Sequence, residues 1–179
     1  MNLEDHIRTI PDYPKPGILF RDVSTLVGSA DALAEAVERM CAPYLESDGT
    51  SSVAYVAGIE ARGFTIGGAM AVALGAGFVP IRKAGKLPAA TYAQDYELEY
   101  GTDTVEMHTD AIASGDSVLL VDDLIATGGT AAAAIALLQR AEANIVAAAF
   151  IIDLPDLGGM DRIQALGIET HALLKYSGH

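Results

Sequence analysis

The sequence has little of several features that mark whole classes of protein. Of its 179 residues only Cys41 is a cysteine, so neither an internal disulfide nor a cysteine-based zinc site can form. No apolar run approaches the roughly 20 residues of a membrane-spanning helix. The first ten residues, MNLEDHIRTI, mix both charge signs and lack the apolar segment of a secretory signal. These absences predict a cytoplasmic protein that does not act at a membrane.

Basic residues are also scarce. Eleven Lys and Arg stand against 24 Asp and Glu, which gives a net charge of −13 and argues against nucleic acid as a partner. Three of the eleven, Arg82, Lys83 and Lys86, nevertheless fall within one short segment. A local basic segment on an acidic protein suits a small anionic ligand, although an ordinary solvated loop would have the same composition.

The chain does contain a large apolar fraction, 51% of its residues, which is enough for a sizeable core. Apolar runs typical of buried strands occupy residues 52–58, 77–82, 117–123, 144–153 and 168–174. Helical segments are expected from Asp31, as an N-cap, and then near 63–74, after the glycine pair 128–129 and over 158–167. The alternation predicts an α/β fold with a mostly parallel sheet flanked by helices on both faces, in which ligands bind at the carboxyl ends of strands.

The chain shows no division into parts. We find neither an internal repeat nor a low-complexity linker, so a single domain over residues 1–179 is expected. Residues 83–101 have no clear hydrophobic period, and we expect a long functional loop there.

The segment VLLVDDLIATGGT, residues 118–130, is the most informative part of the sequence. A buried strand ends in two carboxylates, Asp122 and Asp123, and a turn of small residues then leads into a helix. Backbone N–H groups at a helix N-terminus suit a phosphate, and carboxylates accept hydrogen bonds from the hydroxyls of a sugar. The segment is neither a Walker A loop nor a G-x-G-x-x-G motif. It predicts a site for a phosphorylated sugar, and a strand end beside an ordinary capping turn is the alternative.

This segment resembles the phosphoribosyl pyrophosphate signature of the type I phosphoribosyltransferases. Other segments are similar, in the same order, to the adenine phosphoribosyltransferases of that family: DYPKPGILFRDV (12–23), EARGF (60–64), GFVPIRKAGKLP (77–88), DYELEYG (95–101) and DLGG (156–159). The resemblance implies a purine-salvage enzyme that, with Mg²⁺, transfers the 5-phosphoribosyl group from 5-phosphoribosyl 1-pyrophosphate to adenine, giving AMP and pyrophosphate. It also implies a homodimer, an N-terminal hood over residues 1–30 and a mobile flap over 83–101.

The resemblance further implies roles for individual residues. Asp122 and Asp123 would hold the ribose hydroxyls and take part in catalysis, and Mg²⁺ would be held mainly by substrate oxygens, without direct protein ligands. The 5-phosphate would lie on Ala126, Thr127, Gly128, Gly129 and Thr130. Pyrophosphate would be bound by Glu60, Ala61, Arg62, Arg82, Lys83 and Lys86, part of this basic segment reaching the neighbouring subunit. Arg62 would also be catalytic, although without the resemblance it fits a helix-surface charge better.

The purine site follows from the same resemblance. Adenine would be bound by Leu19, Phe20, Arg21 and Leu157, of which the apolar ones are otherwise ordinary core residues. Glu99 would handle a proton near the purine once the flap closes and excludes water, with Tyr100 in support. Without the resemblance, Glu97 and Glu99 are exposed strand carboxylates two positions apart.

Two other functions compete with this interpretation. A 6-oxopurine phosphoribosyltransferase would share the fold, but those enzymes usually offer a lysine shortly after the signature, and no lysine lies between residues 87 and 174. A regulator that senses phosphoribosyl pyrophosphate or a purine would need a nucleic-acid-binding domain or a basic face, and the sequence indicates neither.

Overall fold

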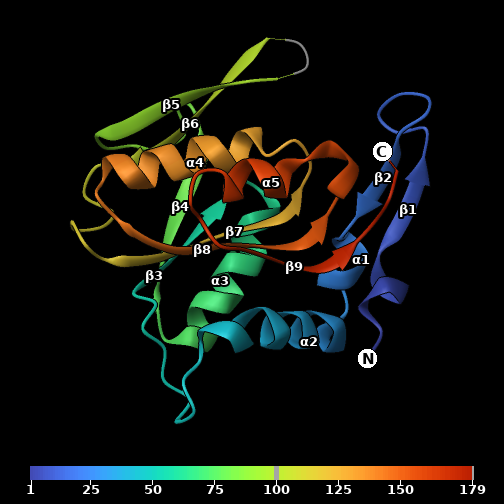
Figure 1. Cartoon of the computed structure of the whole chain (residues 1–179), viewed down its shortest axis with the longest axis horizontal. Helices are drawn as coiled ribbons and strands as arrows, with labels where there is room; N and C mark the ends of the chain where they lie inside the picture. The colour runs from blue at the N-terminus through green and yellow to red at the C-terminus, as the bar shows by residue number, and fades with distance from the viewer. Residues whose placement is uncertain (99–100, 179) are drawn as a thin grey trace.

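The structure, a computed structural model, describes residues 1–98 and 101–178 and confirms the predicted α/β architecture (Figure 1). A two-stranded sheet pairs β1 (Arg8–Pro11) with β2 (Leu19–Asp22), and the main sheet has the strand order β5-β6-β4-β3-β7-β8-β9. The main-sheet strands are β3 (Tyr55–Ile59), β4 (Gly77–Lys83), β5 (Thr91–Glu97), β6 (Thr102–His108), β7 (Ser117–Ile125), β8 (Asn144–Asp153) and β9 (Thr170–Lys175). From β4 to β9 along this order the neighbours are parallel, whereas β6 runs antiparallel to both β4 and β5.

Helices cover both faces of the main sheet. The helices are α1 (Ser24–Val27), α2 (Ala30–Cys41), α3 (Arg62–Leu74), α4 (Gly129–Arg140) and α5 (Gly159–Gln164), with short 3₁₀ turns at Leu3–His6, Ala42–Tyr44 and Pro155–Leu157. One core lies under α2 and α3, and a second lies under α4 and α5. Within the described residues no helix is long and apolar enough to cross a membrane.

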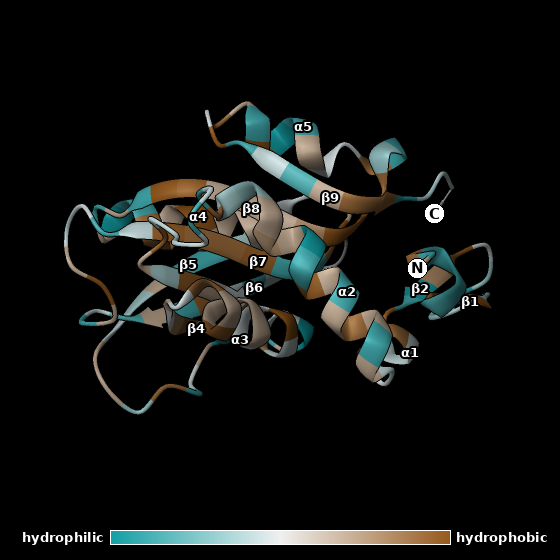
Figure 2. Cartoon of the chain, turned by 90° about the horizontal axis from the view of Figure 1, so that it is seen from below, coloured by the Kyte–Doolittle hydropathy of each residue, from teal (hydrophilic) through white to brown (hydrophobic). Residues whose placement is uncertain are grey.

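The central strand β7 shows why the continuous apolar runs predict a covered sheet. Side chains alternate along a strand, so Leu119 and Val121 enter the core under α3, while Val118 and Leu120 enter the core under α4. Figure 2 shows the strongest hydrophobic colours on such central strands, between the helices. The register sets Gly58 of β3 opposite Val121 of β7, so the carboxyl ends of these two strands emerge side by side.

Two local predictions are wrong. The first long helix takes Ser29 rather than Asp31 as its N-cap, because the Ser29 hydroxyl accepts the Ala32 N–H at 3.4 Å. Residues 83–101 are not one loop, since Thr91–Glu97 forms β5 and pairs along its whole length with β6. This pairing, and not apolar periodicity, makes the segment a strand: its tyrosines pack on α4, where the Arg140 guanidinium lies 4.7 Å from the Tyr92 ring centroid.

Candidate active site

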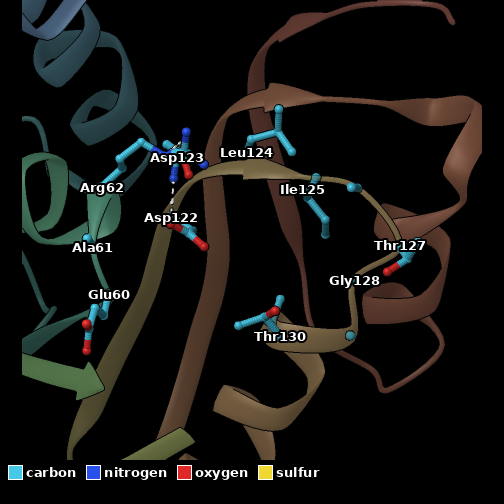
Figure 3. Close-up of a pocket in the computed structure, with 13 residues that line it drawn as sticks. Glu60, Ala61, Arg62, Asp122, Asp123, Leu124, Ile125, Thr127, Gly128 and Thr130 are labelled. Atoms are coloured by element: carbon cyan, nitrogen blue, oxygen red, sulfur yellow. Dashed lines mark hydrogen bonds and ion pairs between the residues drawn. The ribbon is translucent and has the colours of Figure 1, made fainter. Parts of the chain in front are cut away.

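A polar cavity of about 270 Å³ opens where β3 and β7 end (Figure 3). Two segments line it: residues 60–62, where β3 passes into α3, and residues 122–131, from the end of β7 to the first turn of α4. The peptide bond between Glu60 and Ala61 is cis. The cavity therefore occupies the place that the parallel-sheet rule predicts, outside the carboxyl ends of adjacent strands.

The turn between β7 and α4 leaves the N-terminus of α4 open towards this cavity. Gly128 precedes the helix with a left-handed backbone (φ 75°), and no side chain of the described residues caps the helix. The segments that carry Thr127 and Thr130 face the same space, as Figure 3 shows. Backbone N–H groups and the partial positive charge of the 12-residue helix thus combine into a cradle for an anion.

The two adjacent carboxylates of β7 differ in their surroundings. Asp123 is 4% exposed and forms an ion pair with Arg62, with Nε and Oδ2 2.8 Å apart. Asp122 points to the other side of the strand, towards the cavity, and its Oδ1 accepts the Asp123 N–H at 2.9 Å. Burial, and then the neighbouring charge of Asp123, raises the pKa of Asp122 well above its usual value. Burial also raises the pKa of Asp123, although Arg62 opposes the shift.

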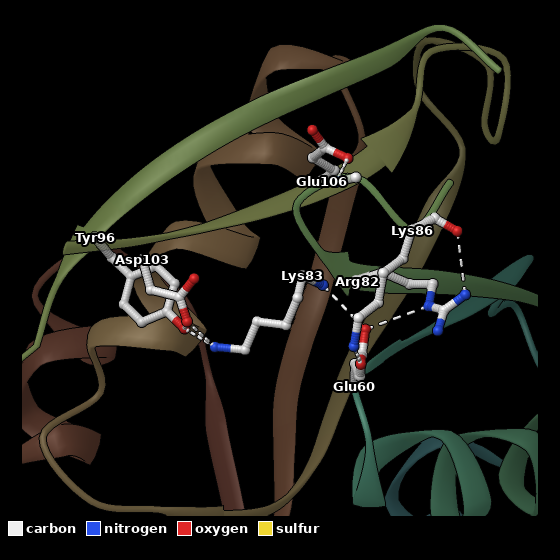
Figure 4. Close-up of polar contacts among 8 residues, drawn as sticks. Glu60, Arg82, Lys83, Lys86, Tyr96, Asp103 and Glu106 are labelled. Carbon is white, nitrogen blue, oxygen red and sulfur yellow. Dashed lines mark hydrogen bonds and ion pairs between the residues drawn. The ribbon is translucent and has the colours of Figure 1, made fainter. Parts of the chain in front are cut away.

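The basic segment divides between two partners, as Figure 4 shows. The Glu60 carboxylate accepts a hydrogen bond from Arg82 Nε at 3.3 Å and forms an ion pair with Lys86. Burial works against the ionised form of Glu60, but these contacts hold its pKa below the usual value. Lys83 turns the other way and binds Asp103 and Tyr96 of the β5–β6 hairpin. Glu60, Arg82 and Lys86 are therefore brought together beside the cavity, and the Lys83 side chain is not.

A second, mostly apolar cavity of about 360 Å³ lies next to the first. The sequence-predicted purine residues meet here: Leu19, Phe20, Arg21 and Leu157. Three apolar residues also line it that the sequence did not single out: Ile18, Leu124 and Leu154. Each of the three stands next in the sequence to a predicted site residue or to the end of a predicted strand, and this adjacency could have identified them. Four residues line both cavities: Arg62, Leu124, Ala126 and Thr127. The Arg62 guanidinium lies 5.6 Å from the Phe20 ring centroid.

The remaining predicted site residues, Glu99 and Tyr100, lie outside the described residues. The described part of β5 ends close to the anion cradle, because the Glu97 carbonyl oxygen is 3.5 Å from the position that a Cβ on Gly129 would occupy. In the described part of the chain no three His, Cys, Asp or Glu side chains form a group that could hold a metal ion. The oxygen donors at the polar cavity are of the kind that Mg²⁺ prefers, so a shared, substrate-bound ion fits them.

Comparisons with known proteins match most of the chain. The family model "Phosphoribosyl transferase domain" matches residues 27–172. The adenine phosphoribosyltransferase of Maricaulis maris is 60% identical over 99% of both chains, and that of Methylobacterium radiotolerans is 55% identical over 99% of this chain and 96% of its own.

Solved structures give the same result. The adenine phosphoribosyltransferase of Rhodothermus marinus superposes with a TM-score of 0.88 at 49% identity, covering 97% of this chain and 96% of its own. The enzyme of Saccharomyces cerevisiae, solved with an imino-altritol bisphosphate and adenine, has a TM-score of 0.90 at 38% identity and covers 96% of each chain.

Proposed function

The chain belongs to the phosphoribosyltransferase family and, within it, to the adenine phosphoribosyltransferases, and from this premise we propose how its two cavities divide the reaction. Phosphoribosyl pyrophosphate occupies the polar cavity, and adenine occupies the apolar one. The observation that carries this proposal is that the cavities share four lining residues, so a sugar in one and a base in the other meet at their common wall: Arg62, Leu124, Ala126 and Thr127.

In the polar cavity the sugar phosphate is held at both ends. The 5-phosphate lies on the turn from Ala126 to Thr130, at the open N-terminus of α4. The pyrophosphate lies towards Arg62, Arg82 and Lys86, where it competes with Glu60 for the last two cations. Lys83 contributes only after its side chain leaves Asp103.

The carboxylates Asp122 and Asp123 act on the ribose. They accept hydrogen bonds from its hydroxyls, and their negative charge, only partly balanced by Arg62, stabilises the positive charge that develops at the sugar as pyrophosphate departs. The bond from C1 to the pyrophosphate oxygen breaks while the purine nitrogen bonds to C1 and loses its proton. Glu99 is the proposed acceptor of that proton. Mg²⁺, held mainly by substrate oxygens, supplies charge neutralisation for the pyrophosphate.

In the apolar cavity the base lies between Phe20 and Leu157, and the backbone around Leu19 and Arg21 reads its polar edge. The Arg21 side chain holds this backbone in place through two contacts. Its guanidinium lies 4.4 Å from the Tyr176 ring centroid and donates a hydrogen bond to the Thr9 hydroxyl at 2.7 Å. Closure of the flap then excludes water that would hydrolyse the activated sugar.

The proposal includes a homodimer that acts in the cytoplasm. Exposed apolar side chains support an interface between two copies of the chain, since Val72 of α3 is 84% exposed and Phe78 of β4 is 37% exposed. Sedimentation of the purified protein across a concentration series checks the dimer, and a monomer at all concentrations would contradict it.

A coupled assay tests the function. The purified protein is incubated with Mg²⁺, phosphoribosyl pyrophosphate and, separately, adenine, hypoxanthine, guanine or xanthine, and nucleotide and pyrophosphate are both followed. We expect turnover with adenine, and omission of Mg²⁺ should abolish it. Turnover with an oxopurine alone would overturn the assignment of the base, and phosphoribosyl pyrophosphate binding without turnover would favour a sensor.

A further inference from the structure

Arg162 of α5 lies beside the anion cradle and has no place in the reaction as described so far. A Cβ placed on Gly129 would be 3.7 Å from Arg162 Nη1 and 3.8 Å from Thr127 Oγ1. The guanidinium and this hydroxyl therefore approach the same glycine, at the start of α4. The side chain comes from an element that packs directly against the cradle, because Gly159 of α5 leaves no room for a Cβ beside Ala126 and Gly128.

Among the described residues nothing pairs with the charge of Arg162. Over the residues that the structure describes, its side chain makes no hydrogen bond and no ion pair, and it is exposed. Asp95 and Glu97 line the same cavity of about 300 Å³ between β5 and α4, yet neither carboxylate lies within ion-pair distance of the guanidinium. A cation at a helix N-terminus is repelled by the helix dipole, so this position is unfavourable until an anion binds between them.

The other cations of the site are already engaged. Arg62 pairs with Asp123, and Arg82 and Lys86 pair with Glu60. The cradle itself, residues 126–130, contains neither Lys nor Arg. A sugar phosphate bound there would bring close to two negative charges near the carboxylates of β7, and only backbone dipoles and hydroxyls of the cradle would face it.

We propose that Arg162 is a further substrate-binding residue, which donates a charged hydrogen bond to the 5-phosphate from the side of α5. It selects ligands that carry a terminal phosphate monoester and does not contact the base. The assignment rests on the proposed function, because it places a phosphorylated sugar in the cradle.

Paired ligands test the assignment, since AMP and adenosine differ only in the phosphate. Titration calorimetry with both ligands, and steady-state kinetics with adenine and phosphoribosyl pyrophosphate, are compared for the wild type, Arg162→Gln and Arg162→Lys. Loss of one charged hydrogen bond should weaken AMP binding and raise the KM for phosphoribosyl pyrophosphate by about tenfold or more. Adenosine affinity and the KM for adenine should stay unchanged, and the lysine variant should recover part of the loss. Arg39→Gln, at an exposed arginine of α2 that lines neither cavity, is the matched control and should change neither.

The outcomes separate the assignment from the proposed function. Unchanged AMP affinity in Arg162→Gln, with normal AMP binding by the wild type, would overturn the role of Arg162 alone. Equal losses for AMP and adenosine, or an equal loss in Arg39→Gln, would show a general structural effect and would also overturn it. A wild-type protein that binds neither AMP nor phosphoribosyl pyrophosphate would overturn the proposed function itself.

Discussion

Gly159→Ala tests how tightly α5 holds the anion cradle. A Cβ at Gly159 would lie 2.3 Å from the Ala126 carbonyl oxygen, 2.7 Å from Ile125 Cγ1 and 2.9 Å from the Gly128 nitrogen. Two of these three atoms belong to the backbone and cannot rotate away. An ordinary contact begins at 3.4 Å, so the cradle and α5 must separate by about 1 Å to admit the methyl group. Overpacking of this kind costs about 1–3 kcal/mol of stability.

The kinetic consequence should be larger than the loss of stability suggests, because a displacement of about 1 Å in a substrate-positioning segment can cost about a hundredfold in rate. We expect kcat/KM for phosphoribosyl pyrophosphate, measured by steady-state kinetics, to fall by about ten- to a hundredfold. Urea unfolding of the same variant measures the loss of stability. Gly68→Ala is the control: nothing lies within 4 Å of a Cβ there, in the interior of α3. This change should leave the rate intact and stabilise the helix by up to about 1 kcal/mol. Wild-type kinetics and stability in Gly159→Ala would refute the close contact.

Three further changes probe the site and the fold. Asp122→Asn should abolish turnover yet raise the free energy of unfolding at pH 7 by about 0.5–2 kcal/mol. Burial and the charge of Asp123 raise the pKa of Asp122 in the folded state, so its ionised form destabilises the fold once the pH exceeds the pKa of the unfolded chain. The gain in stability from the substitution should therefore shrink towards pH 4. Urea unfolding that shows an equal gain at pH 7 and pH 4 would contradict this. Asp22→Asn should cost about 1 kcal/mol at pH 7. Hydrogen bonds, led by those from Ser24, lower the pKa of Asp22 to about 2, so its contribution is complete above pH 4 and disappears towards pH 2, and acid unfolding curves of the two proteins should converge there. Phe20→Ala should raise the KM for adenine by about tenfold through lost stacking and leave that for phosphoribosyl pyrophosphate nearly unchanged, which initial rates will check; equal changes in both would remove Phe20 from the purine site.

Much of this architecture follows from local sequence. Buried parallel strands are apolar on both faces, so β3, β7 and β8 appear as continuous apolar runs without any knowledge of their neighbours. The place of the polar cavity follows as well, since the residues after two such strands must share one edge of the sheet. The fold class was therefore predictable, and so was the segment that lines most of the cavity.

The hairpin that carries β5 was not predictable in this way. Its strand, Thr91–Glu97, is mostly polar, and it is stable through pairing with β6 and through tyrosines that pack on α4. The same limitation affects Lys83. In the sequence it belongs to one basic segment, but β4 extends through it, so the consecutive side chains of Arg82 and Lys83 turn to opposite sides. Of these two side chains only that of Arg82 reaches Glu60, whereas that of Lys83 binds Asp103. Composition locates a charge, whereas strand length decides where it points.

The contact between α5 and the cradle lies between these two cases. The topology requires it, because β7 and β8 are parallel neighbours joined through α4, and the turn after β8 must emerge beside the turn after β7. A sequence that predicts the sheet thus predicts that DLGG approaches ATGGT. It does not predict which side chain of the following helix faces the cradle, since that depends on where the helix begins. The structure begins α5 at Gly159, and a start at this glycine brings its backbone against Ala126 and places Arg162, about one turn later, over Gly129. Gly159 and Arg162 are therefore parts of one arrangement. The close packing of the α5 backbone against the cradle sets the distance between the Arg162 guanidinium and Gly129.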